Sequence, residues 1–141
     1  MNEYRWTELR LGLRAEFQAM VSESAMDAFA QISGDRNPLH MDKAFAASRG
    51  FPGRVVFGML SSSFYSQLVG HHLPGKWALL HGLDIELKAP VFIGERLTVS
   101  GEIVHLSDAY KRLEIKASIV NMQGKTVSKA KIRAGIHEQQ P

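Results

Sequence analysis

The C-terminal half of the chain alternates apolar and polar residues in several short runs. In LDIELKA (83–89), RLEIKASI (112–119) and KAKIRAGI (129–136), every second residue is apolar, and most residues between them are charged or polar. A period of two is typical of strands with one buried and one solvated face. With RLTVSGEIVHL (96–106) between them and NMQGK (121–125) as a turn, the pattern predicts an antiparallel meander of about four strands.

One stretch can cover the dry face of such a sheet. Residues 58–70, GMLSSSFYSQLVG, carry no charge, and their apolar side chains spread around most of the helical circumference. A helix without a polar stripe is expected inside a protein. We therefore predict an α+β fold in which a curved antiparallel β-sheet wraps around this central α-helix. LRAEFQAMV (13–21) is a candidate fifth strand, and the chain fits one domain, residues 1–141.

A shorter helix is predicted before this core segment. In SESAMDAFAQIS (22–33), apolar residues recur at helical spacing, and Ser24 with Asp27 forms a capping signal of the Ser-x-x-Asp kind. Gly34 can end the helix by adopting a left-handed conformation. The chain is then expected to turn.

The polar turn SGDRNPLHMDKAFA (33–46) contains the candidate chemistry. Part of it has a structural reading, because Asn37 can cap a helix that Pro38 starts, and Asp42 can cap the next one. Neither cap needs Asp35 or His40, and both residues lie in an otherwise apolar neighbourhood. An aspartate and a histidine five positions apart are candidates for an acid/base pair, although such pairs are also common as structural hydrogen bonds.

Composition narrows the possible functions. Hydrophobic residues make up 45% of the chain and charged residues 22%, as in ordinary globular proteins. With no cysteine, disulfide scaffolds, zinc fingers and thiol nucleophiles are excluded, and a cytoplasmic location is favoured. The N-terminus lacks the apolar core of a secretory signal, and residues 55–73 are too polar for a membrane span.

The charge pattern argues against nucleic-acid binding. The net charge of +3 is modest, and the basic residues are scattered rather than clustered. A mildly positive field suits an anionic ligand such as a nucleotide-bearing cofactor, or it serves only solubility.

Several other chemistries lack their motifs. The sequence contains no G-x-G-x-x-G, H-E-x-x-H or G-x-S-x-G run, so nucleotide, metal and serine-nucleophile chemistry are not predicted. His71 and His72 lie near the C-terminal end of the uncharged helix, where the helix dipole favours positive charge. We prefer this interpretation to one in which the two histidines are metal ligands. His81, His105 and His137 stand singly, as surface or hydrogen-bonded histidines do.

Four segments together resemble a known family. SGDRNPLHMDKAFAASRGF (33–51), VVFGMLSSSFYSQLVG (55–70), LPGKW (73–77) and APVFIGERLTV (89–99) are similar, in order and spacing, to the MaoC-like (R)-specific enoyl-CoA hydratases and dehydratases of the hot-dog fold. The similarity runs from about Phe17 to the C-terminus. It implies a hydro-lyase that interconverts trans-2-enoyl and (R)-3-hydroxyacyl thioesters of coenzyme A or acyl carrier protein. It also implies a homodimer or higher homo-oligomer and no metal or redox cofactor.

The resemblance assigns roles to five residues. The catalytic aspartate of the family corresponds to Asp35 and its catalytic histidine to His40, which together would activate water. Gly58, at the start of the helix, would help to stabilise the oxyanion on the thioester. Asn37 would steady the catalytic loop. Ser66 would support the histidine or the ligand, unless its hydroxyl only bonds to its own backbone.

One position departs from the family pattern. Phe57 stands where these enzymes usually have histidine before the helix glycine, which we expect to make the mouth of the site more apolar. Two rival functions are considered beside the hydratase. One is a hot-dog acyl thioesterase, and the other is a non-catalytic acyl-thioester-binding subunit, of which Phe57 would be a first sign. The D-x-N-P-x-H spacing favours the hydratase.

Overall fold

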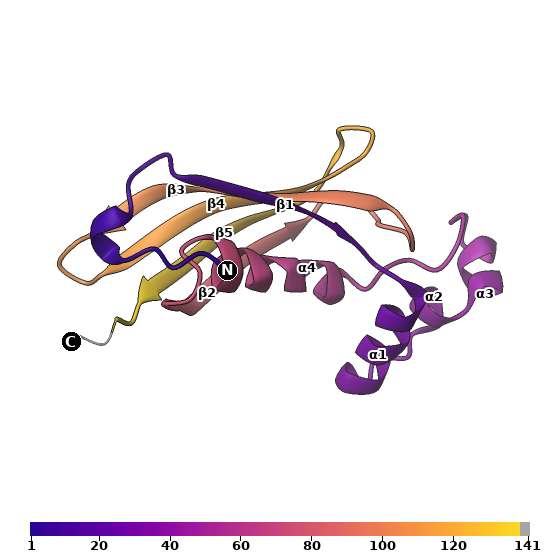
Figure 1. The fold of residues 1–141 in the computed structure, drawn as a ribbon. Coiled ribbons are helices and arrows are strands. Elements are labelled where there is room, and N and C mark those ends of the chain that lie inside the picture. The colour runs from indigo at the N-terminus through magenta and orange to yellow at the C-terminus, as the bar shows by residue number, and fades with distance from the viewer. Residues whose placement is uncertain (139–141) are drawn as a thin grey trace.

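A five-stranded antiparallel sheet forms the body of the molecule, as a computed structural model describes it for residues 1–138. The strands follow the order β1-β3-β4-β5-β2 across the sheet (Figure 1). They are β1 (Arg14–Met20), β2 (Ala78–Leu87), β3 (Arg96–Ser107), β4 (Arg112–Asn121) and β5 (Thr126–Ile136). The predicted meander is confirmed in β3, β4 and β5, and the candidate fifth strand lies beside β3.

Alternation along the strands separates the two faces of the sheet. On β4, Leu113, Ile115 and Ile119 are buried, while Glu114 and Lys116 between them are wholly or partly exposed. Since successive strand residues point to opposite faces, one face is apolar along its length.

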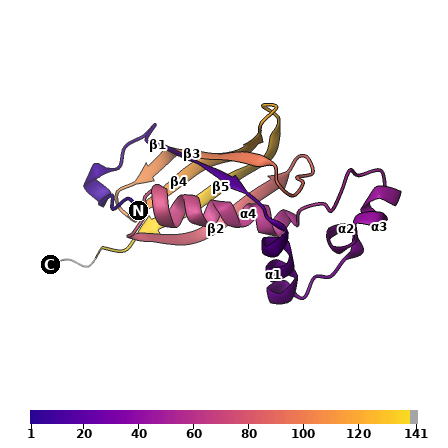
Figure 2. The ribbon, with the colours of Figure 1, turned by 45° about the vertical axis from the view of Figure 1, so that its right-hand side comes forward.

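The helix α4 (Gly58–Gln67) lies across this apolar face and continues as a π-helix, η2 (Leu68–His72) (Figures 1 and 2). Tyr65 is fully buried, and its hydroxyl lies 2.8 Å from the Ser128 hydroxyl on β5. Burial raises the pKa of Tyr65 to about 12, against a smaller lowering by this hydrogen bond. The helix is thus bonded to the sheet as well as packed on it, as the predicted architecture requires.

The expectation that α4 lies inside the protein holds for only one side of the helix in the single chain. Met59 is 70% exposed, and Ser63, Ser66 and Gln67 on the same helix are also exposed. The physical reason is that one sheet covers only one side of a helix. An apolar residue on the other side can be buried only by something outside the fold.

The expected role of His72, in the π-helix after α4, also needs correction. The ring of His72 stacks on Phe17 of β1, with centroids 4.7 Å apart. Burial, followed by the nearby His71 and the N-terminus, lowers the pKa of His72. The environment of this ring therefore favours its neutral form, not the positive charge that the helix dipole predicts.

Three short helices stand beyond one end of the sheet (Figure 1). They are α1 (Glu23–Ser33), α2 (Pro38–Met41) and α3 (Lys43–Ser48), and a 3₁₀ turn, η1 (Trp6–Glu8), lies near the N-terminus. The predicted cap at Ser24 is wrong, because Ser22 has the extended conformation of a cap and its hydroxyl accepts the Ala25 N–H at 3.1 Å. Gly34 ends α1 with a φ of 75°, as predicted.

Candidate active site

The polar turn folds through its own side chains. The Asn37 carboxamide accepts the Leu39 N–H at 2.9 Å and Pro38 occupies the first turn of α2, which confirms the predicted start of this helix. The Asp35 carboxylate accepts the Asn37 N–H at 3.0 Å, and Asp42 caps α3. These local bonds explain why the sequence turns here twice within a few residues.

The imidazole of His40 is fixed by one backbone carbonyl. Its Nδ1 lies 2.7 Å from the Val55 carbonyl oxygen. Since a carbonyl only accepts hydrogen bonds, Nδ1 carries the proton, and Nε2 of the neutral ring is left as an acceptor. The half-buried ring therefore presents a base to whatever lies beside it.

The Phe57 ring packs against the imidazole of His40. It is 2% exposed, and its centroid lies 4.3 Å from that of His40 and 4.8 Å from that of Phe29. The prediction that Phe57 forms the mouth of the site is wrong, because the side chain turns into the core. Phe57 instead provides an apolar surface on which the imidazole packs.

A hollow of about 470 Å³, here called the inner hollow, opens beside His40. Its walls come from the loop before α4, the first turn of α4, the end of β2 and the loop after it. The lining residues are His40, Val55, Val56, Gly58, Ser61, Leu87, Lys88, Ala89, Pro90, Val91 and Val127. Most of these are apolar, and His40, Ser61 and Lys88 are the polar groups among them, a composition usual for a ligand site.

The N-terminus of α4 lies at the inner hollow. Gly58 is its first residue, and Phe57 before it makes no side-chain capping bond, whereas Ser22, Asn37 and Asp42 each cap a helix. The first N–H groups of a helix have no partner within it and form the positive end of its dipole. A Cβ at Gly58 would collide with the Leu87 side chain, so glycine keeps this end accessible.

Three predicted site residues, Asp35, Asn37 and Ser66, are not among those that line the inner hollow. Asp35 is exposed, and within residues 1–138 no hydrogen bond joins it to His40. Ser66 lies about two turns along α4 and is also exposed. Ser61, Ser62 and Ser63 donate to helix carbonyls, whereas no such bond from Ser66 is found within residues 1–138, and both readings of Ser66 stay predictions.

Sequence reasoning missed Ser61 and Lys88, which line the inner hollow. Ser61 stands three residues after Gly58, and this helical spacing, which brings two side chains to one face, was the available signal. Lys88 ends a strand next to Pro90, and only the folded sheet brings it to His40.

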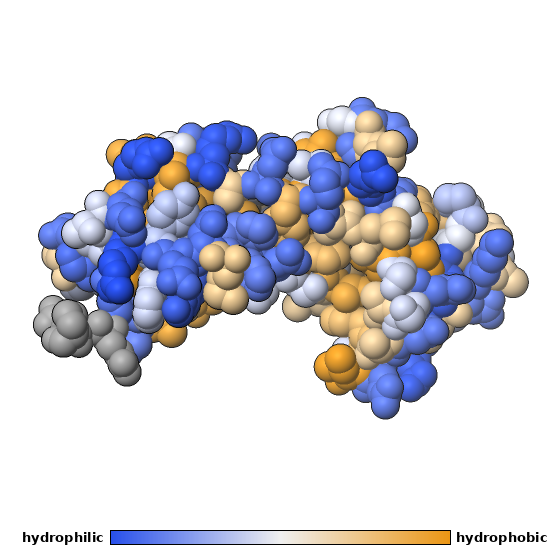
Figure 3. Space-filling view, in the orientation of Figure 1, coloured by the Kyte–Doolittle hydropathy of each residue, from blue (hydrophilic) through white to orange (hydrophobic). Residues whose placement is uncertain are grey.

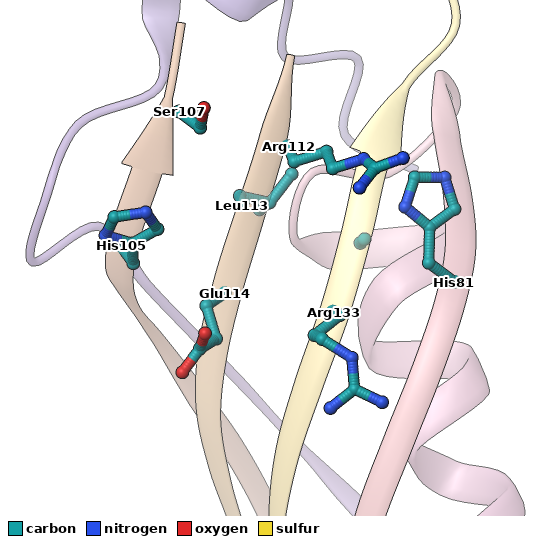
Figure 4. Close-up of a pocket in the computed structure, with 8 residues that line it drawn as sticks. His81, His105, Ser107, Arg112, Leu113, Glu114 and Arg133 are labelled. Atoms are coloured by element: carbon teal, nitrogen blue, oxygen red, sulfur yellow. The ribbon is translucent and has the colours of Figure 1, made fainter. Parts of the chain in front are cut away.

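A second hollow, here called the outer hollow, lies on the sheet surface and measures about 310 Å³ (Figure 4). Glu114 on β4, which alternates with buried Leu113 and Ile115, shows that it belongs to the face turned away from α4. Its lining residues are His81, His105, Ser107, Arg112, Leu113, Glu114, Arg133 and Ala134. It contains none of the predicted site residues.

Residues 1–138 contain neither a cluster of metal-binding side chains nor a helix suited to cross a membrane. No three histidine, aspartate or glutamate side chains there come together as a metal site. No helix in that range has both the length and the apolar character to cross a membrane.

Comparison with known proteins places the chain in a family. A model of the MaoC-like domain matches residues 9–130, so the chain belongs to the MaoC-like domain family. The match starts before Phe17, where the resemblance in the sequence was expected to begin.

Named relatives and a solved structure agree with this. An (R)-specific enoyl-CoA hydratase from Aeromonas caviae is 39% identical over 100 residues, covering 71% of this chain and 75% of the relative. A 3-hydroxybutyryl-CoA dehydratase from Methylorubrum extorquens is 32% identical over 108 residues, covering 77% of this chain and 69% of the relative. The solved (R)-hydratase of A. caviae, involved in PHA biosynthesis, superimposes with a TM-score of 0.88 at 32% identity, covering 92% of this chain and 98% of that one. The predicted hot-dog fold is confirmed.

Proposed function

We propose that this protein is a hydro-lyase that adds water across trans-2-enoyl thioesters of coenzyme A or acyl carrier protein, giving (R)-3-hydroxyacyl thioesters, and catalyses the reverse dehydration. Family membership and the names of the relatives support this reaction class. The observation that carries it for this chain is the His40 ring, bonded through Nδ1 to the Val55 carbonyl beside the N-terminus of α4.

The proposed mechanism needs a base, an acid and a group that stabilises an oxyanion. Nε2 of His40 takes a proton from water as the water oxygen adds to the β-carbon, and the pair of Asp35 and His40 returns a proton to the α-carbon. Negative charge develops on the thioester oxygen during this addition. The N–H groups at the start of α4, next to Gly58, are suited to stabilise it.

A second copy of the chain would complete the site. β2 is an edge strand, whose backbone groups on one side are free to pair with another strand. Met59 and Leu87, 70% and 59% exposed, lie on α4 and β2 near the inner hollow, and Figure 3 shows apolar surface gathered toward this end of the molecule. A homodimer through β2 and α4 would bury these side chains and enclose Asp35 and Ser66, which are exposed in the single chain.

Three parts of the proposal rest on sequence alone. These are a cytoplasmic location, the absence of a cofactor beyond the carrier of the acyl group, and the steadying role of Asn37. The Asn37 role fits its capping bond to the Leu39 N–H. Lys88 at the hollow, whose ammonium group pairs with the exposed Glu86 carboxylate at 2.6 Å in the single chain, could exchange this partner for a phosphate of the carrier.

The test is one incubation of the purified protein with crotonyl-CoA. Both the absorbance of the conjugated thioester and the free thiol are followed over time. Loss of absorbance without thiol release supports the hydratase. Thiol release would replace it with the thioesterase, and no change in either signal would replace it with a non-catalytic binding subunit.

A further inference from the structure

Arg54, in the loop before α4, joins elements that are distant in the sequence. Its side chain is only 11% exposed. Nε donates to the backbone carbonyl of His40 at 2.6 Å, and Nη2 donates to the Asp27 carboxylate on α1 at 3.0 Å. The Glu23 carboxylate, also on α1, lies 3.7 Å from Nη1. One guanidinium group thus links α1 to the end of α2.

Arg54 and its neighbour Val55 bind His40 from two sides. Arg54 bonds to the His40 carbonyl, and the Val55 carbonyl accepts from His40 Nδ1 at 2.7 Å. The Val55 N–H donates to the Leu39 carbonyl at 3.1 Å. The next residue is anchored on the loop after β2, since the Val56 N–H donates to the Val91 carbonyl at 2.8 Å. Main chain and ring of His40 are therefore both held by a segment that is itself fixed to the sheet.

The helix that carries His40 cannot hold this position alone. α2 has four residues, and none of them is buried. So short a helix has little stability of its own, and its side chains are only partly buried, Met41 against the core and the His40 ring against Phe57. Bonds from neighbouring segments therefore help to fix the imidazole, and Arg54 supplies one that links α2 to α1.

We propose that Arg54 is a positioning residue, which sets the His40 imidazole against the inner hollow by binding the His40 carbonyl and the α1 carboxylates at once. This inference rests on the proposed function of the same site. Arginine suits the task because its planar fork donates in several fixed directions, whereas a lysine ammonium group has no such fork. The carboxylates of Asp27 and Glu23 compensate the charge of the largely buried cation.

The kinetic test compares Arg54→Gln and Arg54→Lys with Arg49→Gln. Arg49 is an exposed arginine of the same loop and serves as the matched control. With crotonyl-CoA, we expect Arg54→Gln to lower kcat about 10- to 100-fold with KM within about threefold, because a small displacement of a catalytic group costs this much. Arg54→Lys should retain an intermediate kcat. Arg49→Gln should match the parent protein.

A spectroscopic readout separates positioning from general stability. Nitrogen NMR of the histidine side chains should show His40 as the Nδ1-protonated tautomer in the parent protein and a mixture of tautomers in Arg54→Gln. Thermal unfolding of each variant is measured alongside. If Arg54→Gln fails to fold, the same comparison on Arg54→Lys decides.

Two results would overturn the proposal. One is a folded Arg54→Gln, or Arg54→Lys in its place, with kcat within twofold of the parent. The other is an unchanged His40 tautomer in that variant. If the parent protein itself does not hydrate crotonyl-CoA, the proposed function fails, whereas the tautomer comparison still decides whether Arg54 positions His40.

Discussion

The inner and outer hollows differ in a way that ionisable residues alone would not reveal. The outer hollow has two histidines, two arginines and a glutamate among its lining residues, and the inner hollow has one histidine and one lysine. In the outer hollow, Arg133 pairs with Asp84 at 2.8 Å and Glu114 pairs with Lys131 at 3.2 Å. Two of its three charged side chains are therefore compensated, and so is Lys88 of the inner hollow, whose ammonium group lies 2.6 Å from the Glu86 carboxylate.

What distinguishes the inner hollow is how its single histidine is held. His40 has one nitrogen bonded to a carbonyl and its ring packed on Phe57, so the other nitrogen has a defined role and direction. His81 and His105 form no side-chain hydrogen bond within residues 1–138, so nothing there selects a tautomer or orientation. Catalysis is therefore to be expected where an imidazole ring is preorganised beside a helix terminus.

The largest expected effect tests the histidines of the two hollows against each other. His40→Ala removes the proposed base and should lower kcat for crotonyl-CoA hydration by about 1,000-fold, within the usual range for general acid–base groups. His81→Ala, the matched change in the outer hollow, should leave kcat within about twofold of the parent. Equal losses in both variants would remove the distinction between the hollows.

The next effect concerns the carboxylate that the single chain leaves exposed. Asp35→Asn keeps an oxygen that can accept the Asn37 N–H, so the turn should fold while the charge is lost. We expect a loss of about 100-fold or more in kcat, since a carboxamide cannot exchange a proton as an acid/base partner does. Glu114→Gln in the outer hollow is the control. Near-full activity of Asp35→Asn would exclude Asp35 from the mechanism.

A smaller effect is expected at the start of α4. Gly58→Ala places a methyl group against Leu87, a flexible and mostly exposed side chain that can move at little cost in stability. The methyl group still narrows the inner hollow beside the helix N–H groups. We expect kcat/KM to fall about 10-fold while the melting temperature changes by roughly 2 °C or less.

Two variants interpret that result. Gly70→Ala, in the π-helix that continues α4, meets open space and should behave as the parent. Leu87→Ala combined with Gly58→Ala should recover part of the lost activity. A loss in Gly70→Ala as large as that in Gly58→Ala would indicate a general effect on the helix and not one at its start.

The smallest effect is expected from the outer hollow itself. The double change Arg112→Gln and His105→Ala removes the guanidinium group that lies over the Tyr110 ring. It also removes one of the two imidazole rings of the outer hollow. Exposed changes of this kind usually alter the free energy of unfolding by less than about 0.5 kcal/mol, and kcat/KM should stay within twofold. A 10-fold loss of kcat/KM would instead connect the outer face of the sheet to catalysis.

Sequence patterns predict those parts of the molecule that depend on neighbouring residues. The alternation in β4, the left-handed Gly34 and the Asn37 cap before Pro38 are properties of a few consecutive positions, and all are found. The direction of the Phe57 side chain is not such a property, because Phe29 and His40 must first come together around it.

The exposed face of α4 and the contacts of Arg54 show the same limit. The sequence shows that Met59 is an apolar residue of a predicted helix. It does not show that the sheet leaves this side of the helix uncovered. Arg54 meets His40 across 14 positions and Asp27 across 27, and no local pattern marks such distant bonds. For Asp35 the sequence supplies a candidate role, which stays a prediction until the variant is measured.

The short segment from Arg54 to Gly58 also limits how the chain can change in length. It bonds to the carbonyl of His40, then to its ring, then to Val91, before the helix begins at Gly58. One inserted residue between these positions would displace the groups that form every later bond. A side chain at Gly50 or Gly53, before Arg54, would meet open space instead, so changes in this loop should be better tolerated there than between Arg54 and Gly58.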